Sequence, residues 1–181
     1  MVVGSSGSGK TFLTQRLSSI LDLPYLELDS VFHRGGWSNT PDDQFQHEIE
    51  RFAGARRWVV DGNYTSHGTR EMLWPLADTF VWLDPPIRTV MRRVITRTLK
   101  RVVTREELWD GVREPWSNLY SLDPHKNIIV WAWTRFEHTR SNLEVAMTDG
   151  TWAHAEVHRL STAEEVDRFL LAVYESASTE R

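Results

Sequence analysis

The stretch GSSGSGKT at residues 4–11 constrains the fold more than any other part of the chain. It satisfies the pattern G-x-x-x-x-G-K-[ST] at every fixed position and directly follows Val2 and Val3. Glycines allow a curled loop whose backbone N–H groups converge on phosphate oxygens, and the N-terminus of a following helix adds its dipole. A flexible Gly/Ser linker is the alternative, but a linker requires neither the Lys-Thr pair nor the amphipathic segment that follows. The sequence therefore predicts a strand, a phosphate-binding loop and a helix, in that order.

Each residue of this loop has an expected contact with ATP and Mg²⁺. The backbone that surrounds the phosphates would come from Gly4, Ser5, Ser6, Gly7, Ser8 and Gly9. Lys10 would reach the β- and γ-phosphates, and the Thr11 hydroxyl would be a ligand of Mg²⁺. A strand usually has about five residues, and only residues 1–3 precede this loop. We therefore expect the natural chain to begin a few residues earlier.

Strand-like and helix-like segments alternate along the rest of the chain. Short β-prone runs predict strands at 25–28, 57–60, 79–83 and 155–160, and apolar residues at helical spacing predict helices at 11–21, 42–53, 87–103, 128–147 and 162–176. This order is typical of an α/β fold with a parallel sheet, helices on both faces and a ligand site beyond the carboxyl ends of the strands. We expect a single three-layer domain over residues 1–181.

The composition excludes several classes of function. With 40% hydrophobic and 25% charged residues the chain is typical of a soluble globular protein, and its net charge of −4 gives no general attraction to nucleic acid. No cysteine is present, which excludes disulfides and thiol chemistry. The seven histidines show no metal-ligand spacing, so we expect no zinc site. No signal peptide or membrane-spanning run is visible, and we expect a cytoplasmic protein without a membrane partner.

Three aspartates follow expected strands and would meet at the same edge of the sheet. Asp61 precedes Gly62 and Asn63, where a strand ends in a turn, and we expect it to organise Mg²⁺. Asp29 would bind either Mg²⁺ or the hydroxyl of an acceptor, or it would cap the following turn. Asp84 precedes two prolines, which favours a role in forming a turn.

Arginine accounts for 18 of the 21 cationic residues, and its planar guanidinium group suits phosphate and carboxylate. Arg93, Arg97 and Arg101 repeat every four residues and share one helix face. This face is either solvated and ion-paired or a clamp that stabilises charge on a transferred phosphoryl group, and the clamp is favoured for the first two. Trp37 would stack on a ring or pack in the core. The candidates for binding the acceptor are Asp29, Arg34, Trp37, Asn63, Arg70, Arg135 and Arg140.

The segment from Trp82 to Arg97 resembles the D-x-P-x₆-R-x₃-R pattern of adenylate kinases, in the nucleoside-monophosphate-kinase branch of the P-loop proteins. In that family the two arginines bind ATP phosphates at the entry to a helical lid, and Arg93 and Arg97 fall on their positions. Val59 to Gly62 is similar to the strand end whose aspartate orients a Mg²⁺-bound water. Asn63-Tyr64 stands where adenylate kinases continue F-P-R, so the arginine that grips the acceptor nucleotide is missing.

Nearly the whole chain resembles the small adenylate-kinase-like proteins called DNA topology modulation proteins. The shared features are Leu23-Pro24, Leu28-Asp29, Gly36-Trp37, Trp58 to Tyr64, Ala77-Asp78, Trp82 to Asp84 and Trp131 to Arg140. The resemblance implies a P-loop NTPase fold. In this fold the acceptor-binding segment would lie at about residues 30–57 and the lid at about residues 92–140. It implies little about the acceptor.

Two functions follow from these observations. The first is a phosphotransferase that uses ATP and Mg²⁺ to phosphorylate a nucleotide or another small molecule. Its catalytic residues would be Lys10, Asp29, Asp61, Arg93 and Arg97. The alternative is an ATP-binding or ATPase regulatory protein in which the nucleotide drives a conformational switch, with DNA as a further partner. The identity of the acceptor and the choice between monomer and homodimer stay open.

Overall fold

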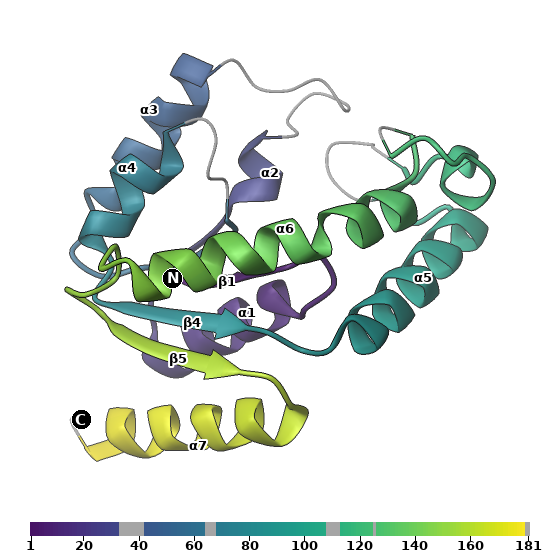
Figure 1. The fold of residues 1–181 in the computed structure, drawn as a ribbon. Helices are drawn as coiled ribbons and strands as arrows, with labels where there is room; N and C mark the ends of the chain where they lie inside the picture. The colour runs from purple at the N-terminus through teal and green to yellow at the C-terminus, as the bar shows by residue number, and fades with distance from the viewer. Residues whose placement is uncertain (33–41, 64–67, 108–112, 125, 180–181) are drawn as a thin grey trace.

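The computed structural model describes residues 1–32, 42–63, 68–107, 113–124 and 126–179 (Figure 1). Within these residues one parallel sheet has the strand order β2-β3-β1-β4-β5. Its strands are β1 (Val2–Gly4), β2 (Tyr25–Glu27), β3 (Val59–Asp61), β4 (Thr79–Leu83) and β5 (Glu156–Leu160). The strand that feeds the phosphate-binding loop is therefore the central one, and the expected parallel sheet is confirmed.

Helices lie on both faces of this sheet, as the alternating pattern predicts (Figure 1). The α-helices are α1 (Lys10–Leu21), α2 (Leu28–Phe32), α3 (Asp42–Ala53), α4 (Thr69–Leu73), α5 (Ile87–Thr104), α6 (Ile128–Thr148) and α7 (Ala163–Thr179). Two 3₁₀ helices are η1 (Trp74–Leu76) and η2 (Trp116–Leu119). The short α2 and α4 were not expected, because one turn of helix leaves no readable periodicity.

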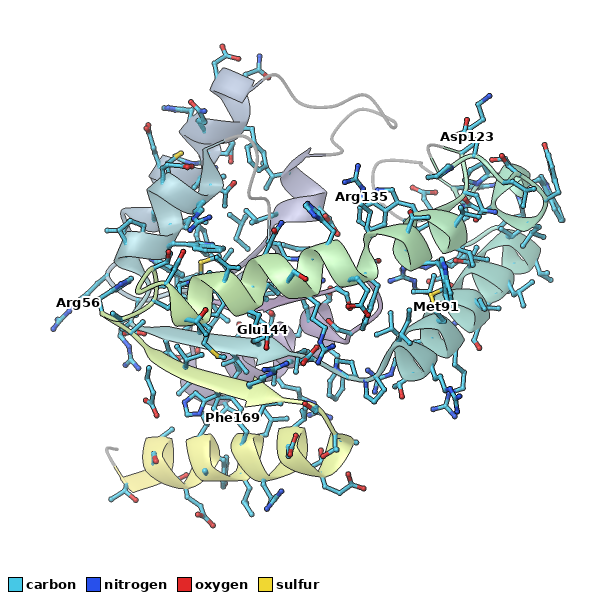
Figure 2. All side chains as sticks on the ribbon, in the orientation of Figure 1. Arg56, Met91, Asp123, Arg135, Glu144 and Phe169 are labelled. Carbon is cyan, nitrogen blue, oxygen red and sulfur yellow. The ribbon has the colours of Figure 1, made fainter. Side chains whose placement is uncertain are left out.

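Alternate residues of the strands enter two separate cores. On one face Val2 and Val81 pack with Leu13 of α1 and Phe169 of α7, which Figure 2 shows between α7 and the sheet. The residues that point to the other face pack beneath α3, α4 and α6, and they include Val3, Val60, Phe80 and Trp82. Because strand side chains alternate between faces, the consecutive valines of β1 serve both cores and hold the start of the loop rigidly.

A third apolar cluster joins α5 to the first half of α6, beyond the edge of the sheet (Figure 1). Val90 and Val94 of α5 are fully buried against Ala132 and Phe136 of α6, with Met91 between the two helices (Figure 2). Of these two helices, α5 carries Arg93 and Arg97, the arginines expected in the clamp. None of the helices described here is both long and apolar enough to cross a membrane.

The strand register brings chemically active side chains to one edge of the sheet. Glu27, the last residue of β2, is paired with Asp61, the last residue of β3, and Gly4 of β1 is paired with Leu83 of β4. The Met1 ammonium group donates to the Thr79 carbonyl oxygen at 2.6 Å, which fixes the other end of β1. The expectation of an earlier natural start stays a prediction.

Candidate active site

The loop between β1 and α1 has the curled shape expected for phosphate binding. Gly7 has φ 82°, and a Cβ built there would lie 2.5 Å from Cγ2 of Val94, so α5 packs directly on the loop. The Lys10 ammonium group donates to the carbonyl oxygen of Ser5 at 3.2 Å. The backbone N–H of Ser8 also donates to this oxygen, at 3.1 Å. Lys10 therefore lies over the loop, where its charge would meet a phosphate that binds there.

Thr11 and Asp61, the two expected Mg²⁺ ligands, are in direct contact. The Thr11 hydroxyl donates to Oδ2 of Asp61 at 2.5 Å, and the Asp61 side chain is buried. Burial raises the pKa of the Asp61 carboxyl, whereas the Lys10 charge and the Thr11 hydrogen bond lower it. Hard oxygen ligands of this kind suit Mg²⁺, which completes its shell with phosphate oxygens and water. In the described part of the chain, no group of three His, Asp or Glu side chains could hold a metal ion alone.

Asn63 holds the start of the loop from the end of β3. Its Oδ1 accepts from the backbone N–H of Gly4 at 2.9 Å, and its Nδ2 donates to the carbonyl oxygen of Gly4 at 2.8 Å. The backbone N–H of Gly62 donates to Val2 just before this contact. The side chain of Asn63 thus continues the pairing of β1 with β3 by one step. This role was not expected from the sequence, which indicated only a candidate for acceptor binding.

Glu27 was not expected at the site from the sequence, and it forms one group of carboxylates with Asp61 and Asp29. Its pKa is raised to about 7, first by burial and then by the negative charges of Asp61 and Asp29, and the positive charges of Lys10 and Arg101 lower it. The available signal was an acidic residue two positions before Asp29, at the end of an expected strand. Asp29 itself lies in the first turn of α2 with an exposed side chain, close enough to Asp61 to raise its pKa.

The arginines of α5 extend from the loop toward the region beyond the sheet. Arg93 Nη1 donates to the carbonyl oxygen of Ser8 at 2.7 Å, which places this guanidinium group on the loop. Arg97, one turn later, is half-buried, and its Nε has no hydrogen-bond partner among the described residues. Burial and the neighbouring charge of Arg101 lower the pKa of Arg97, against the effect of Glu114, Asp29 and Glu27. Both arginines expected in the clamp therefore lie beside the candidate phosphate site.

Arg140 pairs with Asp84, at the end of β4. Arg140 Nε donates to Oδ1 of Asp84 at 3.0 Å, and Arg159 Nη2 donates to Oδ2 at 2.6 Å. Arg159 also lies over the ring of Trp82, 4.1 Å from its centroid. Asp84 therefore does more than form a turn, since it joins α6 and β5 to β4. Its carboxylate already engages the Arg140 guanidinium group, which was expected to bind the acceptor.

The other expected acceptor residues are dispersed. Arg135 is exposed on α6 and projects away from β4 and β5 (Figure 2). Arg70 lies over the ring of Trp74 at 4.9 Å and donates to the Thr151 hydroxyl at 3.0 Å, beside a hollow of about 470 Å³. Because these partners precede β4 and β5, Arg70 is at the amino ends of the strands, opposite the phosphate loop. Arg34 and Trp37 lie outside the described residues.

Comparison with solved structures relates this arrangement to a known fold. Neither a family model nor a curated protein sequence matches the chain. A shikimate kinase from Acinetobacter baumannii, solved in complex with shikimate, aligns over 99% of this chain and 92% of its own, with a TM-score of 0.52 and 15% sequence identity. The chain has the P-loop kinase fold. The expected α/β class is thereby confirmed, whereas the adenylate-kinase-like and topology-modulation subtypes stay predictions.

Proposed function

We propose that the protein is a phosphotransferase that uses ATP and Mg²⁺ to phosphorylate a small-molecule or nucleotide acceptor. The observation that carries this proposal is the contact between Thr11 and Asp61 at 2.5 Å, inside a complete phosphate-binding loop. The contact of Arg93 with the same loop supports transfer rather than simple nucleotide binding. An arginine that reaches the phosphates can neutralise the charge that spreads over a transferred phosphoryl group.

Each part of the loop then has a role in holding the donor. The backbone N–H groups of residues 4–9 and the Lys10 ammonium group hold the phosphates, and Thr11 and Asp61 hold the ion. Mg²⁺, when bound, neutralises charge on the β- and γ-phosphates. Arg93 and Arg97 orient the γ-phosphate and stabilise its developing charge. Phosphoryl transfer depends mainly on positioning and charge stabilisation, so these residues suffice for the donor side.

The acceptor binds next to the carboxylates at the end of β2. Asp29 is the residue that positions the acceptor hydroxyl, because it is exposed while it still acts on the buried Asp61. The neighbour with this fold was solved with shikimate, which supports a small acceptor. Arg135, which is exposed on α6, is the candidate to meet an anionic group of the acceptor. The proposal needs neither nucleic acid nor a membrane, and it places the protein in the cytoplasm, as a monomer or a homodimer.

A panel assay of ADP formation tests this function. Purified protein is given ATP and Mg²⁺ with nucleoside monophosphates, with small polyols and hydroxy acids, or with duplex DNA. We expect turnover with one class of small acceptor and no stimulation by DNA. Stimulation by DNA alone would overturn the proposal and support the alternative, a regulatory ATPase with a nucleotide-dependent switch.

The Lys10→Ala variant tests whether the turnover in this assay depends on the phosphate-binding loop. We expect a loss of turnover of at least about 100-fold with an unchanged circular dichroism spectrum, because the hydrogen bond from Lys10 to Ser5 contributes little to the fold as a whole. Lys126→Ala is the control, since Lys126 is an exposed lysine that pairs with Asp123 at 3.9 Å. Full activity in Lys10→Ala would contradict the proposal.

A further inference from the structure

Glu114 is a buried carboxylate in the helical region beside α5. The residue is only 3% exposed, and one of its carboxylate oxygens lies 3.7 Å from Nη1 of Arg101. Asn118 Nδ2 donates to the other carboxylate oxygen, and Arg105 Nη1 donates to the main-chain oxygen of Glu114 at 3.4 Å. Burial of a carboxylate is costly unless cations and hydrogen bonds compensate it. The position of this charge is therefore closely defined.

The same network ties Glu114 to the beginning of α6. Asn118 Oδ1 accepts from the backbone N–H of Ile128, the first residue of α6, at 2.8 Å. Asn127 caps this helix as well, because its side chain accepts from Ile129 at 2.9 Å. Glu114 is thus held between the C-terminal half of α5 and the N-terminus of α6. Its carboxylate cannot move without disturbing one of them.

Arg97 of the proposed clamp and its neighbour Arg101 interact both with Glu114 and with the carboxylates of the active site. Arg97 and Arg101 are one helical turn apart, both half-buried, and each charge disfavours the other. Glu27 and Asp29 act on Arg97 from the strand ends, and Glu114 acts on it from the side of α6. Arg101 interacts with Glu27 as well as with Glu114. The two cations therefore have carboxylates on both sides, Glu27 and Asp29 at the strand ends and Glu114 on the side of α6.

We propose that Glu114 is a positioning residue that holds the guanidinium groups of Arg97 and Arg101 toward the strand ends, ready for the γ-phosphate. The proposal rests on the proposed function and adds a residue that touches neither ATP nor the acceptor. Without the Glu114 charge, the repulsion between two half-buried arginines favours rotation of one of them into solvent. The other arginines of α5 without a partner in the core, such as Arg92, are already exposed.

The effect of Glu114 would appear in the response to the γ-phosphate rather than in general nucleotide affinity. The loop backbone binds the α- and β-phosphates of ATP and ADP alike, and it does not depend on Glu114. The arginines act on the γ-phosphate and on charge that develops during transfer. Loss of their orientation should therefore lower kcat and the preference for ATP over ADP, defined as the ratio of the two dissociation constants.

Glu114→Gln, with the same shape and no charge, is the central variant. We expect kcat to fall about tenfold or more, the KM for ATP to change less than kcat, and the ATP preference measured by calorimetry to fall. Glu114→Asp should recover most of both. Glu106→Gln is the matched control, because Glu106 is exposed just beyond the end of α5 and pairs with Lys100 of that helix at 3.6 Å, and it should behave as wild type.

A second variant covers the case in which Glu114→Gln does not fold. Arg101→Gln removes the cation of the same pair from a position nearer the surface, and it should lower the ATP preference as well. If both single variants fold, the double variant should lose no more than either one, because the two residues act through one contact.

The outcomes separate this role from a purely structural one and from the proposed function. If Glu114→Gln and Asn118→Ala both lower the unfolding temperature while kcat and the ATP preference stay at wild-type values, the positioning role is wrong. Binding of nucleotide needs no acceptor, so the ATP preference tests Glu114 even if no acceptor in the panel is phosphorylated. A wild-type chain that binds neither nucleotide would overturn both proposals.

Discussion

The carboxamide of Asn63 forms two hydrogen bonds with the main chain of Gly4. The Gly4 N–H donates to Oδ1 at 2.9 Å, and Nδ2 donates to the Gly4 carbonyl oxygen at 2.8 Å. In a parallel sheet, the backbone of the neighbouring strand would supply one donor and one acceptor for Gly4 at this point. Here the side chain of Asn63 supplies both. Gly4 has φ 147° and leaves β1 at the first step of the phosphate-binding loop. The direction in which the loop leaves the sheet therefore depends on a residue from another strand end.

We expect Asn63→Ala to weaken ATP binding about tenfold and to lower the free energy of unfolding by about 1–3 kcal/mol, because both polar groups of Gly4 lose their partner. Calorimetry with ATP and urea unfolding measure the two effects. Asn142→Ala is the control, since Asn142 is exposed on α6 and its amide contacts the ring of His138 at 3.2 Å. Wild-type affinity in Asn63→Ala would show that the loop keeps its course without this contact.

Gly7→Ala tests the packing of α5 on the loop. The new Cβ would lie 2.5 Å from Cγ2 of Val94, in a backbone conformation with φ 82°. Gly150 has a similar φ of 87° with no atom within 4 Å of a built Cβ, so Gly150→Ala carries the backbone strain alone. We expect Gly150→Ala to cost about 1–2 kcal/mol of stability. Gly7→Ala should cost more and should also abolish measurable ATP binding.

The double variant Gly7→Ala/Val94→Ala separates the clash from the strain. Removal of the Val94 methyl groups provides room for the new Cβ, so ATP binding should return in part. Calorimetry on all four proteins, with wild type as reference, gives the comparison. If Gly7→Ala binds ATP like Gly150→Ala, the close approach of α5 does not define the loop.

Local patterns in the sequence were enough to predict the phosphate loop and the alternation of strands and helices. The GSSGSGKT stretch needs no distant partner to be recognised, and the long helix α5 carries a clear apolar period. Arg93 was expected at the ATP phosphates because residues 82–97 resemble the adenylate-kinase pattern, whereas its four-residue spacing shows only that it shares a helix face with Arg97 and Arg101. These features depend on residues that are close in the sequence.

The contacts that the sequence did not reveal depend on strand register and on helix placement. Glu27 reaches the site only because β2 pairs with β3 in the register that sets it opposite Asp61. Arg70 was expected at the acceptor, yet α4 carries it to the opposite end of the sheet. Spacing along the chain cannot show at which end of a strand a connecting helix lies. The position of an arginine in such a connection relative to the site therefore cannot be predicted from the sequence.

Asp84 should be a major contributor to stability, because it joins two arginines to the end of β4. The residue is 9% exposed and accepts from Arg140 and Arg159. We expect Asp84→Asn to lower the free energy of unfolding by about 2–4 kcal/mol, since Arg140 and Arg159 then lose the carboxylate that they share, and Arg159 keeps its pair with Glu144 at 3.4 Å. Urea unfolding at pH 7 measures this loss. Glu156→Gln, which removes an exposed carboxylate on β5 that meets His158 at 3.1 Å, should cost less than about 1 kcal/mol.

Glu165 caps the N-terminus of α7, and we expect the stability that this cap contributes to depend on pH. Its Oε2 accepts from the backbone N–H of Ser161 at 2.6 Å and of Thr162 at 3.1 Å, and its own N–H donates to the Thr162 hydroxyl at 3.2 Å. These bonds to Ser161 and Thr162 lower the pKa of the Glu165 carboxyl below its ordinary value of 4.5. A carboxylate with a lowered pKa in the folded state stabilises the protein above the unfolded pKa, and this stabilisation is lost as the pH falls through the folded pKa.

Glu165→Gln should therefore unfold at a lower temperature than wild type at pH 7, and the two should converge as the pH falls through the lowered pKa of the folded state. Differential scanning calorimetry from pH 3 to pH 7 gives the comparison. Glu164→Gln is the matched control, because it removes a carboxylate from the same first turn of α7 and so takes away the same charge near the helix N-terminus. Equal effects of the two substitutions at pH 7 would mean that the helix dipole, rather than the hydrogen bonds to Ser161 and Thr162, accounts for the contribution of Glu165.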